Sequence, residues 1–286
     1  MTTPDRLPHF IIAGAAKSAT TWLQKSLQQS PAIFMPDHEP HFFARHYEDG
    51  IEAYRRLFDA APAGAMRGEK SNSYLTMPEA AARIARHVPD ARLVFQLRDP
   101  VTRAYSDYSM LLRRGTVDRD IRRHLDPARA AGGRFLHDGR YADHLARFFD
   151  LFDADQLLVL KYEDVTRDPA GQLDRLARHL GLAGPLALQL PERVTNARAD
   201  IVPRPIRRMI APLRPVLDPV RHAAPMRALR ALVARPERYP EFDAGLKADL
   251  GAFYRGQVER LAAMTGLSFS DWTPMRTEAS RVANLP

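Results

Sequence analysis

The sequence predicts an α/β fold of three layers, P-loop-like, in which helices cover both faces of a central parallel sheet of four or five strands. Short apolar segments without polar–apolar alternation are typical of strands buried on both faces. Helical patterns separate these segments, and such alternation favours a parallel sheet. The 286 residues, 45% of them hydrophobic, can form a large core, and we expect one domain over residues 1–286.

The expected elements follow in chain order. The strands are residues 10–13, 32–35, 66–69, 92–97 and 157–161. The helices are residues 20–29, 77–87, 100–113, 141–152, 168–180 and 242–265. Thr76 before Pro78 predicts the start of the second helix, and Asp–Pro pairs at 99–100 and 168–169 predict the starts of the third and the fifth. Such residues cap helices, and proline fits the first helical position.

Residues 201–240 differ in composition, with eight prolines and nine arginines against two acidic residues. Each proline removes a backbone donor, so no long helix is expected there. We predict that residues 201–236 form a flap or insertion that covers one side of a functional site. Its arginines and apolar residues would suit a bound molecule that is part anionic and part apolar, which would be the acceptor if the protein is a transferase, or peripheral contact with a membrane. The alternative is an ordinary surface elaboration.

Charge and composition limit the function. The net charge is +8, which favours an anionic partner, and the absence of cysteine excludes disulfides and cysteine nucleophiles. No apolar run approaches the ~20 residues of a membrane span, so we expect no integral membrane segment. The apolar start predicts a buried strand rather than a signal peptide, because Asp5 offsets Arg6. We expect a cytoplasmic protein.

The stretch FIIAGAAKSATTWL, residues 10–23, predicts an anion site between the first strand and the first helix. Backbone N–H groups and the helix dipole attract anions there, and Lys17 adds a full charge. A Walker A loop would need glycines where the chain has Ile11 and Ala16, so an ordinary ATPase loop is disfavoured. The alternative is a tight turn whose hydroxyls only cap the helix.

The segment AAKSATTWL resembles the 5′-phosphosulfate loop of sulfotransferases that use 3′-phosphoadenosine 5′-phosphosulfate (PAPS) and release adenosine 3′,5′-bisphosphate (PAP). The resemblance implies that Lys17 neutralises the bridging oxygen as sulfate leaves, and that Trp22 stacks on adenine. Trp22 could equally be a core aromatic residue. The implied cradle of the 5′-phosphate is the backbone of Ser18, Ala19, Thr20 and Thr21.

The segment FQLRDPVTRAYSDY, residues 95–108, predicts a second phosphate contact. Arg98 ends a strand, where open α/β sheets bind ligands, and its planar fork suits a phosphate. The segment resembles the 3′-phosphate motif of the same sulfotransferases, which implies Arg98 and Ser106 as ligands. A third contact, from Arg198 or Arg204, stays unassigned because the family's lysine–glycine pattern is absent.

The segment DHEPHFFARHY, residues 37–47, resembles the Glu-x-His-Phe-Phe segment of the heparan sulfate N- and O-sulfotransferases, a resemblance that extends over most of residues 8–182 and 237–272. It implies Glu39 as the base that takes the acceptor proton, with His41 assisting. An acid found after Phe-Phe in some of those enzymes is Ala44 here, which puts their saccharide contacts in doubt.

The segment GEKSNSYL, residues 68–75, resembles the family's Glu-Lys-x-x-x-Tyr segment. It implies that Lys70 lies over the sulfate and stabilises charge in the transition state. Asn72 and Tyr74 are candidates for acceptor contacts. In LVLKYEDVTRDP, residues 158–169, we expect Tyr162 and Asp164 to pack and cap rather than react.

The sequence thus predicts transfer of a sulfuryl group from PAPS to a hydroxyl or amine of a saccharide, lipid or small-molecule acceptor. A P-loop-type kinase is the alternative, although no strand ends in a clear apolar-apolar-Asp pattern for its Mg²⁺. A non-catalytic binder of anionic polymer would depend on the charge of +8 alone. The basic residues are scattered, so we expect no nucleic acid partner. We also expect no metal.

Overall fold

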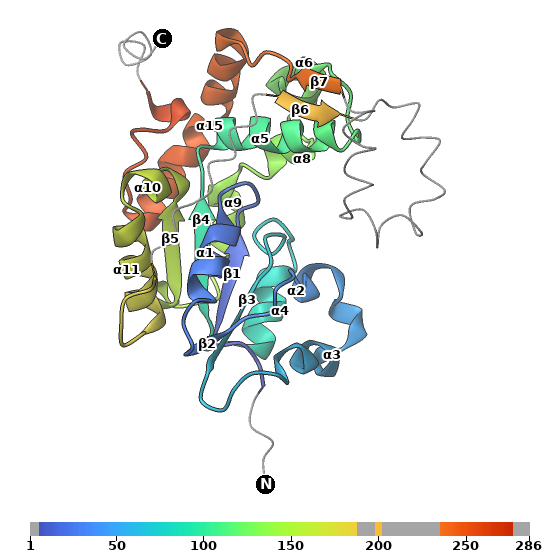
Figure 1. The fold of residues 1–286 in the computed structure, drawn as a ribbon. Helices are drawn as coiled ribbons and strands as arrows, with labels where there is room; N and C mark the ends of the chain where they lie inside the picture. Colours follow the sequence, from blue (N-terminus) through green and yellow to red (C-terminus); the bar gives the residue numbers. More distant parts are fainter. Residues whose placement is uncertain (1–5, 188–197, 202–234, 277–286) are drawn as a thin grey trace.

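A five-stranded parallel sheet organises the protein, as the sequence predicts. The computed structural model describes residues 6–187, 198–201 and 235–276. The strand order is β2-β3-β1-β4-β5, with every neighbouring pair parallel (Figure 1). The strands are β1 Phe10–Gly14, β2 Ile33–Phe34, β3 Met66–Lys70, β4 Arg92–Leu97 and β5 Leu157–Lys161.

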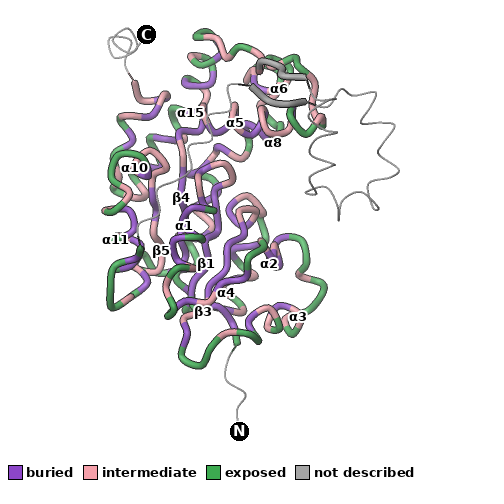
Figure 2. Tube along the Cα trace, viewed as in Figure 1, coloured by how far each residue is buried: buried purple, intermediate pink, exposed green. Residues whose placement is uncertain are grey.

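Each face of the sheet carries its own apolar core, because neighbouring strand residues point to opposite sides. On β1, Phe10 and Ile12 pack with α1 (Thr20–Leu27), α10 (Tyr162–Arg167) and α11 (Pro169–Leu180). Ile11 and Ala13 belong to the larger core on the other face. The helices of that face include α4 (Ala80–His87), α5 (Pro100–Arg113), α9 (Tyr141–Phe149) and α15 (Ala244–Thr265). The strands are therefore mostly buried along their length (Figure 2).

The long helices agree with the sequence prediction except at some ends. Helix α5 begins after Asp99, whose carboxylate accepts the Val101 N–H at 3.0 Å, and α11 begins after Asp168 in the same way. The predicted start of α4 at residue 77 is wrong, since the helix begins at Ala80. Thr76 is not its cap, because its hydroxyl donates to the Ser73 carbonyl within the preceding turns.

Several short helices were not predicted, because each is too short to show a helical period. They are α2 Phe42–Arg45, α3 Ile51–Arg55, α6 Ile121–Leu125, α7 Pro127–Ala130, α8 Arg134–His137 and α10 Tyr162–Arg167. Single 3₁₀ turns cover Tyr47–Asp49, Arg56–Phe58, Ala154–Gln156 and Thr273–Met275. Helix α2 follows directly on the segment that carries the predicted base, so its placement matters for the site.

The predicted flap over residues 201–236 lies almost entirely outside the described residues. Its two flanks form an antiparallel pair, β6 (Arg198–Ile201) with β7 (Arg235–Arg238). The pairing brings the two ends of the segment together, and whether the segment covers an acceptor stays a prediction. Among the helices of the described residues, none is both long and apolar enough to cross a bilayer.

Candidate active site

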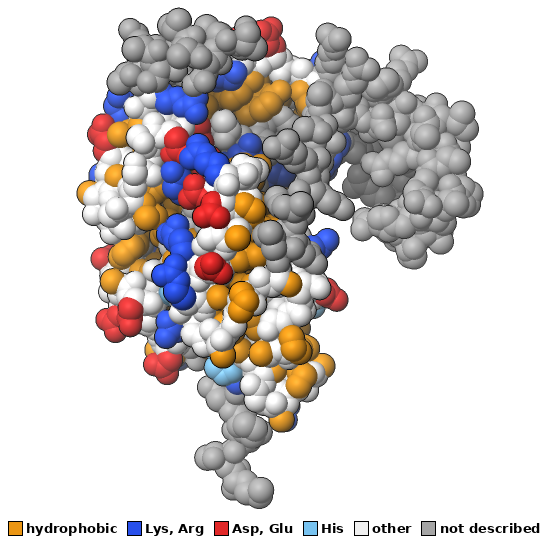
Figure 3. Space-filling view, turned by 60° about the vertical axis from the view of Figure 1, so that its left-hand side comes forward, with side chains coloured by type: hydrophobic (Ala, Val, Ile, Leu, Met, Phe, Trp, Pro, Cys, Tyr) orange, Lys and Arg blue, Asp and Glu red, His pale blue; other side chains and the backbone are white. Residues whose placement is uncertain are grey.

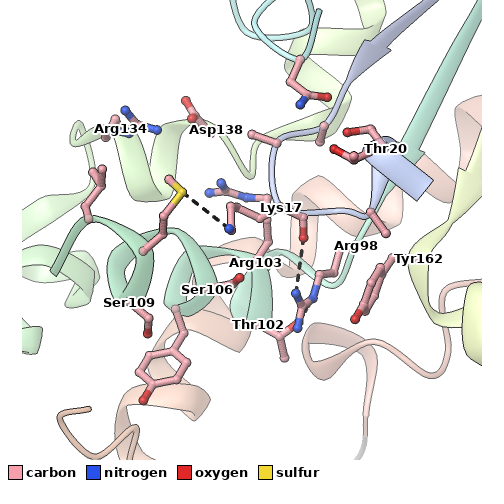
Figure 4. Close-up of a pocket in the computed structure, with 18 of the residues that line it drawn as sticks. Lys17, Thr20, Arg98, Thr102, Arg103, Ser106, Ser109, Arg134, Asp138 and Tyr162 are labelled. Atoms are coloured by element: carbon pink, nitrogen blue, oxygen red, sulfur yellow. Dashed lines mark hydrogen bonds between the residues drawn. The ribbon is translucent and has the colours of Figure 1, made fainter. Parts of the chain in front are cut away.

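One large pocket lies at the carboxyl ends of the parallel strands, where open α/β sheets bind ligands. Its lining comes from the loop after β1, the turn after β3, the end of β4 and one side of α5. Figure 4 shows part of it, with Lys17, Arg98 and Ser106 directed towards a common space. The two segments predicted to bind phosphate meet here, although Lys17 and Arg98 are 81 positions apart along the chain.

The loop between β1 and α1 has the backbone of an anion site. Lys17 and Ala19 both adopt left-handed conformations, with φ of 71° and 59°. The first N–H groups of α1 have no partner within the helix, and they lie beside the positive end of its dipole. The Ser18 hydroxyl is buried and has no hydrogen-bond partner. Ser18 does not line the pocket, whereas Lys17, Ala19, Thr20 and Thr21 do, so an anion in the pocket would meet these residues and not the Ser18 hydroxyl.

Lys17 extends from this loop towards α5. Its ammonium Nζ lies 3.6 Å from the Met110 Sδ, a weak acceptor that does not neutralise the charge (Figure 4). Burial lowers the pKa of the Lys17 ammonium below its ordinary value, and the nearby Asp107 opposes that shift. The lysine is therefore a partly desolvated cation at the edge of the pocket.

Arg98 is held in one orientation at the end of β4. Its Nε donates to the Thr102 hydroxyl at 3.1 Å, and its Nη1 donates to the Lys17 carbonyl at 3.3 Å. The guanidinium lies over the Tyr162 ring, 4.4 Å from the ring centre. Stacking and hydrogen bonds together fix the orientation of the guanidinium, as recognition of a phosphate requires. Ser106 lies two turns further along α5 and lines the same pocket.

Glu39, Lys70 and Thr21 meet at the other end of the pocket. The Lys70 ammonium lies 3.1 Å from the Glu39 Oε1 and donates to the Thr21 hydroxyl at 3.0 Å. Lys70 is only 4% exposed, whereas Glu39 is 27% exposed. This contact joins the carboxylate predicted as the base to the loop predicted to hold the 5′-phosphate.

His41 lies beside the same carboxylate. Its Nε2 is 3.6 Å from the Glu39 Oε2, and its Nδ1 is 2.7 Å from the Ser73 hydroxyl. Burial lowers the pKa of His41, and the neighbouring Glu39 only partly offsets this. The imidazole is therefore neutral at neutral pH, so its contact with Glu39 is not an ion pair.

Two candidates for acceptor contacts have other roles. Asn72 donates to both oxygens of Glu39, from its backbone N–H at 3.0 Å and its side-chain amide at 3.1 Å. It therefore orients the carboxylate, and because Asn72 also lines the pocket, its contact with an acceptor stays a prediction. Tyr74 is completely buried, so the prediction that it contacts an acceptor is wrong. Its hydroxyl is turned inwards and accepts the Phe43 N–H at 3.3 Å.

The remaining predicted site residues are placed less directly. Trp22 packs in the core beneath β1 and is 7% exposed, although its edge also lines the pocket. Its stacking on adenine stays a prediction. Arg204 lies outside the described residues, as does the side chain of Arg198. Tyr162, expected to pack, does so beneath Arg98, but it also lines the pocket.

Sequence reasoning assigned no function to Glu69, which directly precedes Lys70 and carries a buried carboxylate. It is wholly buried and accepts hydrogen bonds from the Tyr54 and Ser71 hydroxyls, at 2.9 and 2.7 Å. The charged residues Arg67 and Lys70 lie in the same short strand, so the charge of Glu69 did not set it apart. Its partners come from a separate helix and from the turn after the strand, which no local pattern connects to it.

Comparison with known proteins agrees with this geometry. The family described as "Sulfotransferase domain" matches residues 7–199, more than half of the chain. The chain belongs to the sulfotransferase family. The chain is also 36% identical over 182 residues to mouse and human "Heparan sulfate glucosamine 3-O-sulfotransferase 3B1". That match covers 62% of this chain and 47% of the relatives, so the chain spans about half of their length.

Two further similarities support the same family. The human "Bifunctional heparan sulfate N-deacetylase/N-sulfotransferase 3" is 32% identical over 210 residues, which cover 63% of this chain and 23% of that protein. A solved sulfotransferase structure from Alicyclobacillus acidocaldarius superposes with a TM-score of 0.67 at 25% identity, covering 93% of this chain and 98% of that one. The sulfotransferase family uses PAPS, so the kinase alternative is not favoured.

Proposed function

We propose that the protein transfers a sulfuryl group from PAPS to a hydroxyl or amine of an acceptor, with Glu39 as the general base. The observation that carries this proposal is the position of Lys70. A single buried ammonium contacts both Glu39 and Thr21, so the base lies one side chain away from the anion loop. This is the arrangement that in-line transfer needs, with donor and acceptor on either side of the sulfur.

Glu39, Lys17 and Lys70 then have separate roles in the transfer. Glu39 takes the proton of the acceptor hydroxyl as its oxygen bonds to sulfur, and the bond between sulfur and the 5′-phosphate oxygen breaks to release PAP. Lys17 and Lys70 stabilise the negative charge that develops on the leaving oxygen and the sulfuryl group. The sulfuryl oxygens would compete with Glu39 for Lys70, which frees the carboxylate to act as a base.

The proposed acceptor is a carbohydrate. The mammalian relatives are named for sulfation of heparan sulfate, and the segment around Glu39 resembles the Glu-x-His-Phe-Phe segment of the heparan sulfate sulfotransferases. The pocket is lined by nine Lys and Arg side chains against three Asp and Glu, an excess that would also suit an anionic sugar. Figure 3 shows Lys and Arg side chains gathered in a band on one face. Lipid and small-molecule hydroxyls are the alternatives, and a cytoplasmic location stays a prediction.

Transfer of labelled sulfate tests the proposal. The protein is incubated with ³⁵S-PAPS and, separately, unsulfated heparan-type oligosaccharides, glycolipids and phenols. We expect label on an oligosaccharide, and Glu39→Gln should lower the rate by ~10²-fold or more with PAP affinity unchanged. Glu48→Gln, an exposed carboxylate on the same segment, is the matched control and should retain full activity. Equal activity of the two variants would contradict Glu39 as the base.

His41→Ala should cost less than Glu39→Gln in the same assay, because a neutral imidazole here can assist the carboxylate without replacing it. If the larger loss came from His41→Ala, His41 would be the base. Label on a glycolipid or phenol alone would contradict the carbohydrate acceptor but leave the donor and the base intact.

A further inference from the structure

Glu69 has no part in the chemistry described above, yet it lies at the centre of the hydrogen bonds behind the base segment. On β3 it is opposite Ile11 of β1, whereas Lys70 is opposite Ile12. Neighbouring residues of a strand point to opposite faces, so Glu69 points into the larger core, away from the pocket side of Lys70. Three hydroxyls face it there, those of Tyr54, Ser71 and Tyr74.

Two of these hydroxyls also hold the backbone of the base segment. The Ser71 hydroxyl accepts the His41 N–H at 2.8 Å, and the Tyr74 hydroxyl accepts the Phe43 N–H at 3.3 Å. His41 needs such support because its φ is 51°, a left-handed conformation that a residue with a side chain adopts at a cost. The two hydrogen bonds thus fix the point at which the chain turns from Glu39 into α2.

The carboxylate determines how those hydroxyls are oriented. A hydroxyl has one proton, and an ionised carboxylate can only accept. When Ser71 donates to Glu69, the lone pairs of its oxygen are left to face the His41 N–H. The same holds for Tyr74 and the Phe43 N–H. Without the carboxylate, each hydroxyl is free to rotate and the backbone N–H groups lose a fixed acceptor.

Side-chain packing also connects Glu69 to the segment that carries the base. Tyr54 donates to Glu69 from α3, and its ring stacks on Phe42 at 4.5 Å between ring centres. The Phe43 ring meets Tyr54 edge-on at 5.0 Å. Glu69 therefore contacts the base segment through three side chains, and through Asn72 and Lys70 the same turn holds the carboxylate of Glu39 itself.

We propose that Glu69 is a positioning residue for the reaction, which fixes the backbone of His41 and Phe43. This inference rests on the proposed function for its effect on rate, but its effect on the backbone can be measured independently of any acceptor. The groups that face Glu69 are the hydroxyls of Tyr54, Ser71 and Tyr74, and the more distant carboxylate of Glu39 acts on it through charge.

The ionisation of Glu69 provides a second readout. Burial raises the pKa of Glu69 to about 7, partly opposed by its hydroxyl partners. Below that pH the carboxyl is protonated and donates, so it can no longer accept from all its partners. The turnover number should then fall as pH decreases through about 7, and this acid limb should be absent in Glu69→Gln.

Amide hydrogen exchange and kinetics of three variants test the proposal. In Glu69→Gln and Ser71→Ala, the His41 amide should exchange at least ~10-fold faster at pH 8, and kcat should fall ~10-fold or more, with PAP affinity and melting temperature nearly unchanged. Glu48→Gln is the control. Because the folded-state pKa of Glu69 is raised, removing its charge relieves a cost of folding at pH 8, so no loss of stability is expected.

The outcomes separate the two proposals. Unchanged His41 exchange in both variants would overturn the positioning role, whether or not sulfate transfer is detected. Faster exchange together with loss of PAP binding and a lowered melting temperature would also overturn it, since Glu69 would then be a general structural residue. A wild-type protein that fails to bind PAP or transfer sulfate contradicts the proposed function, whereas the exchange result still decides the role of Glu69 in the backbone.

Discussion

Replacing Arg98 with alanine should weaken binding of nucleotides that carry a 3′-phosphate and spare those that do not. The guanidinium is fixed by Thr102, the Lys17 carbonyl and the Tyr162 ring, so it meets the phosphate without further ordering. One hydrogen bond between charged groups contributes about 1.5–3 kcal/mol. The affinity for PAP should therefore fall by about 10- to 150-fold, at 1.4 kcal/mol for each factor of ten.

Isothermal titration calorimetry with PAP and with adenosine 5′-monophosphate measures this difference. In the wild type the ratio of the two affinities reports the 3′-phosphate, and in Arg98→Ala that ratio should approach one. Arg92→Ala is the matched control, because Arg92 begins the same strand at the opposite edge of the sheet and contacts the His179 carbonyl. A ratio that is unchanged in Arg98→Ala would refute the assignment of Arg98 to the 3′-phosphate.

Three further predictions concern Lys17 and the fold. Lys17→Ala should lower kcat by ~10²-fold or more with a small change in PAP affinity, measured by steady-state kinetics and calorimetry. An equal loss of kcat and of PAP affinity would contradict a role of Lys17 in the transition state. Because burial lowers the pKa of Lys17, its positive charge is present below that pKa, and kcat should decline as pH rises through a value below that of free lysine. Lys17→Arg should move this decline to higher pH. Asp168→Ala, which removes the cap of α11, should cost about 1 kcal/mol in thermal unfolding but leave PAP affinity unchanged.

Much of the fold follows from local pattern. Strands 92–97 and 157–161 and the helix 100–113 have the predicted bounds, because continuous apolar runs and an Asp–Pro start define them without help from distant residues. The predicted start of α4 was wrong, since the hydroxyl of Thr76 donates to the Ser73 carbonyl instead of capping the helix. Helices as short as α2 depend on tertiary contacts, such as those that hold His41.

Many of the predicted site residues line one pocket, but the contacts among them did not follow from the sequence. Lys70 is the last residue of β3 and Thr21 lies in α1 after the loop that follows β1, so their hydrogen bond depends on these strands being neighbours in the sheet. A sequence pattern does not show that order. Tyr74 was wrongly expected to face an acceptor, because its inward orientation is set by partners elsewhere in the chain, among them Phe43 and Glu69.

A crystal structure of the protein with PAP would test the central claim most directly. We predict the 5′-phosphate against the backbone N–H groups at the start of α1, and the 3′-phosphate within hydrogen-bond distance of Arg98 and Ser106. The 5′-phosphate should then face the Lys70–Glu39 pair, with room for an acceptor beside Glu39. PAP bound away from the α1 loop, or bound there with its 3′-phosphate distant from Arg98, would contradict the account.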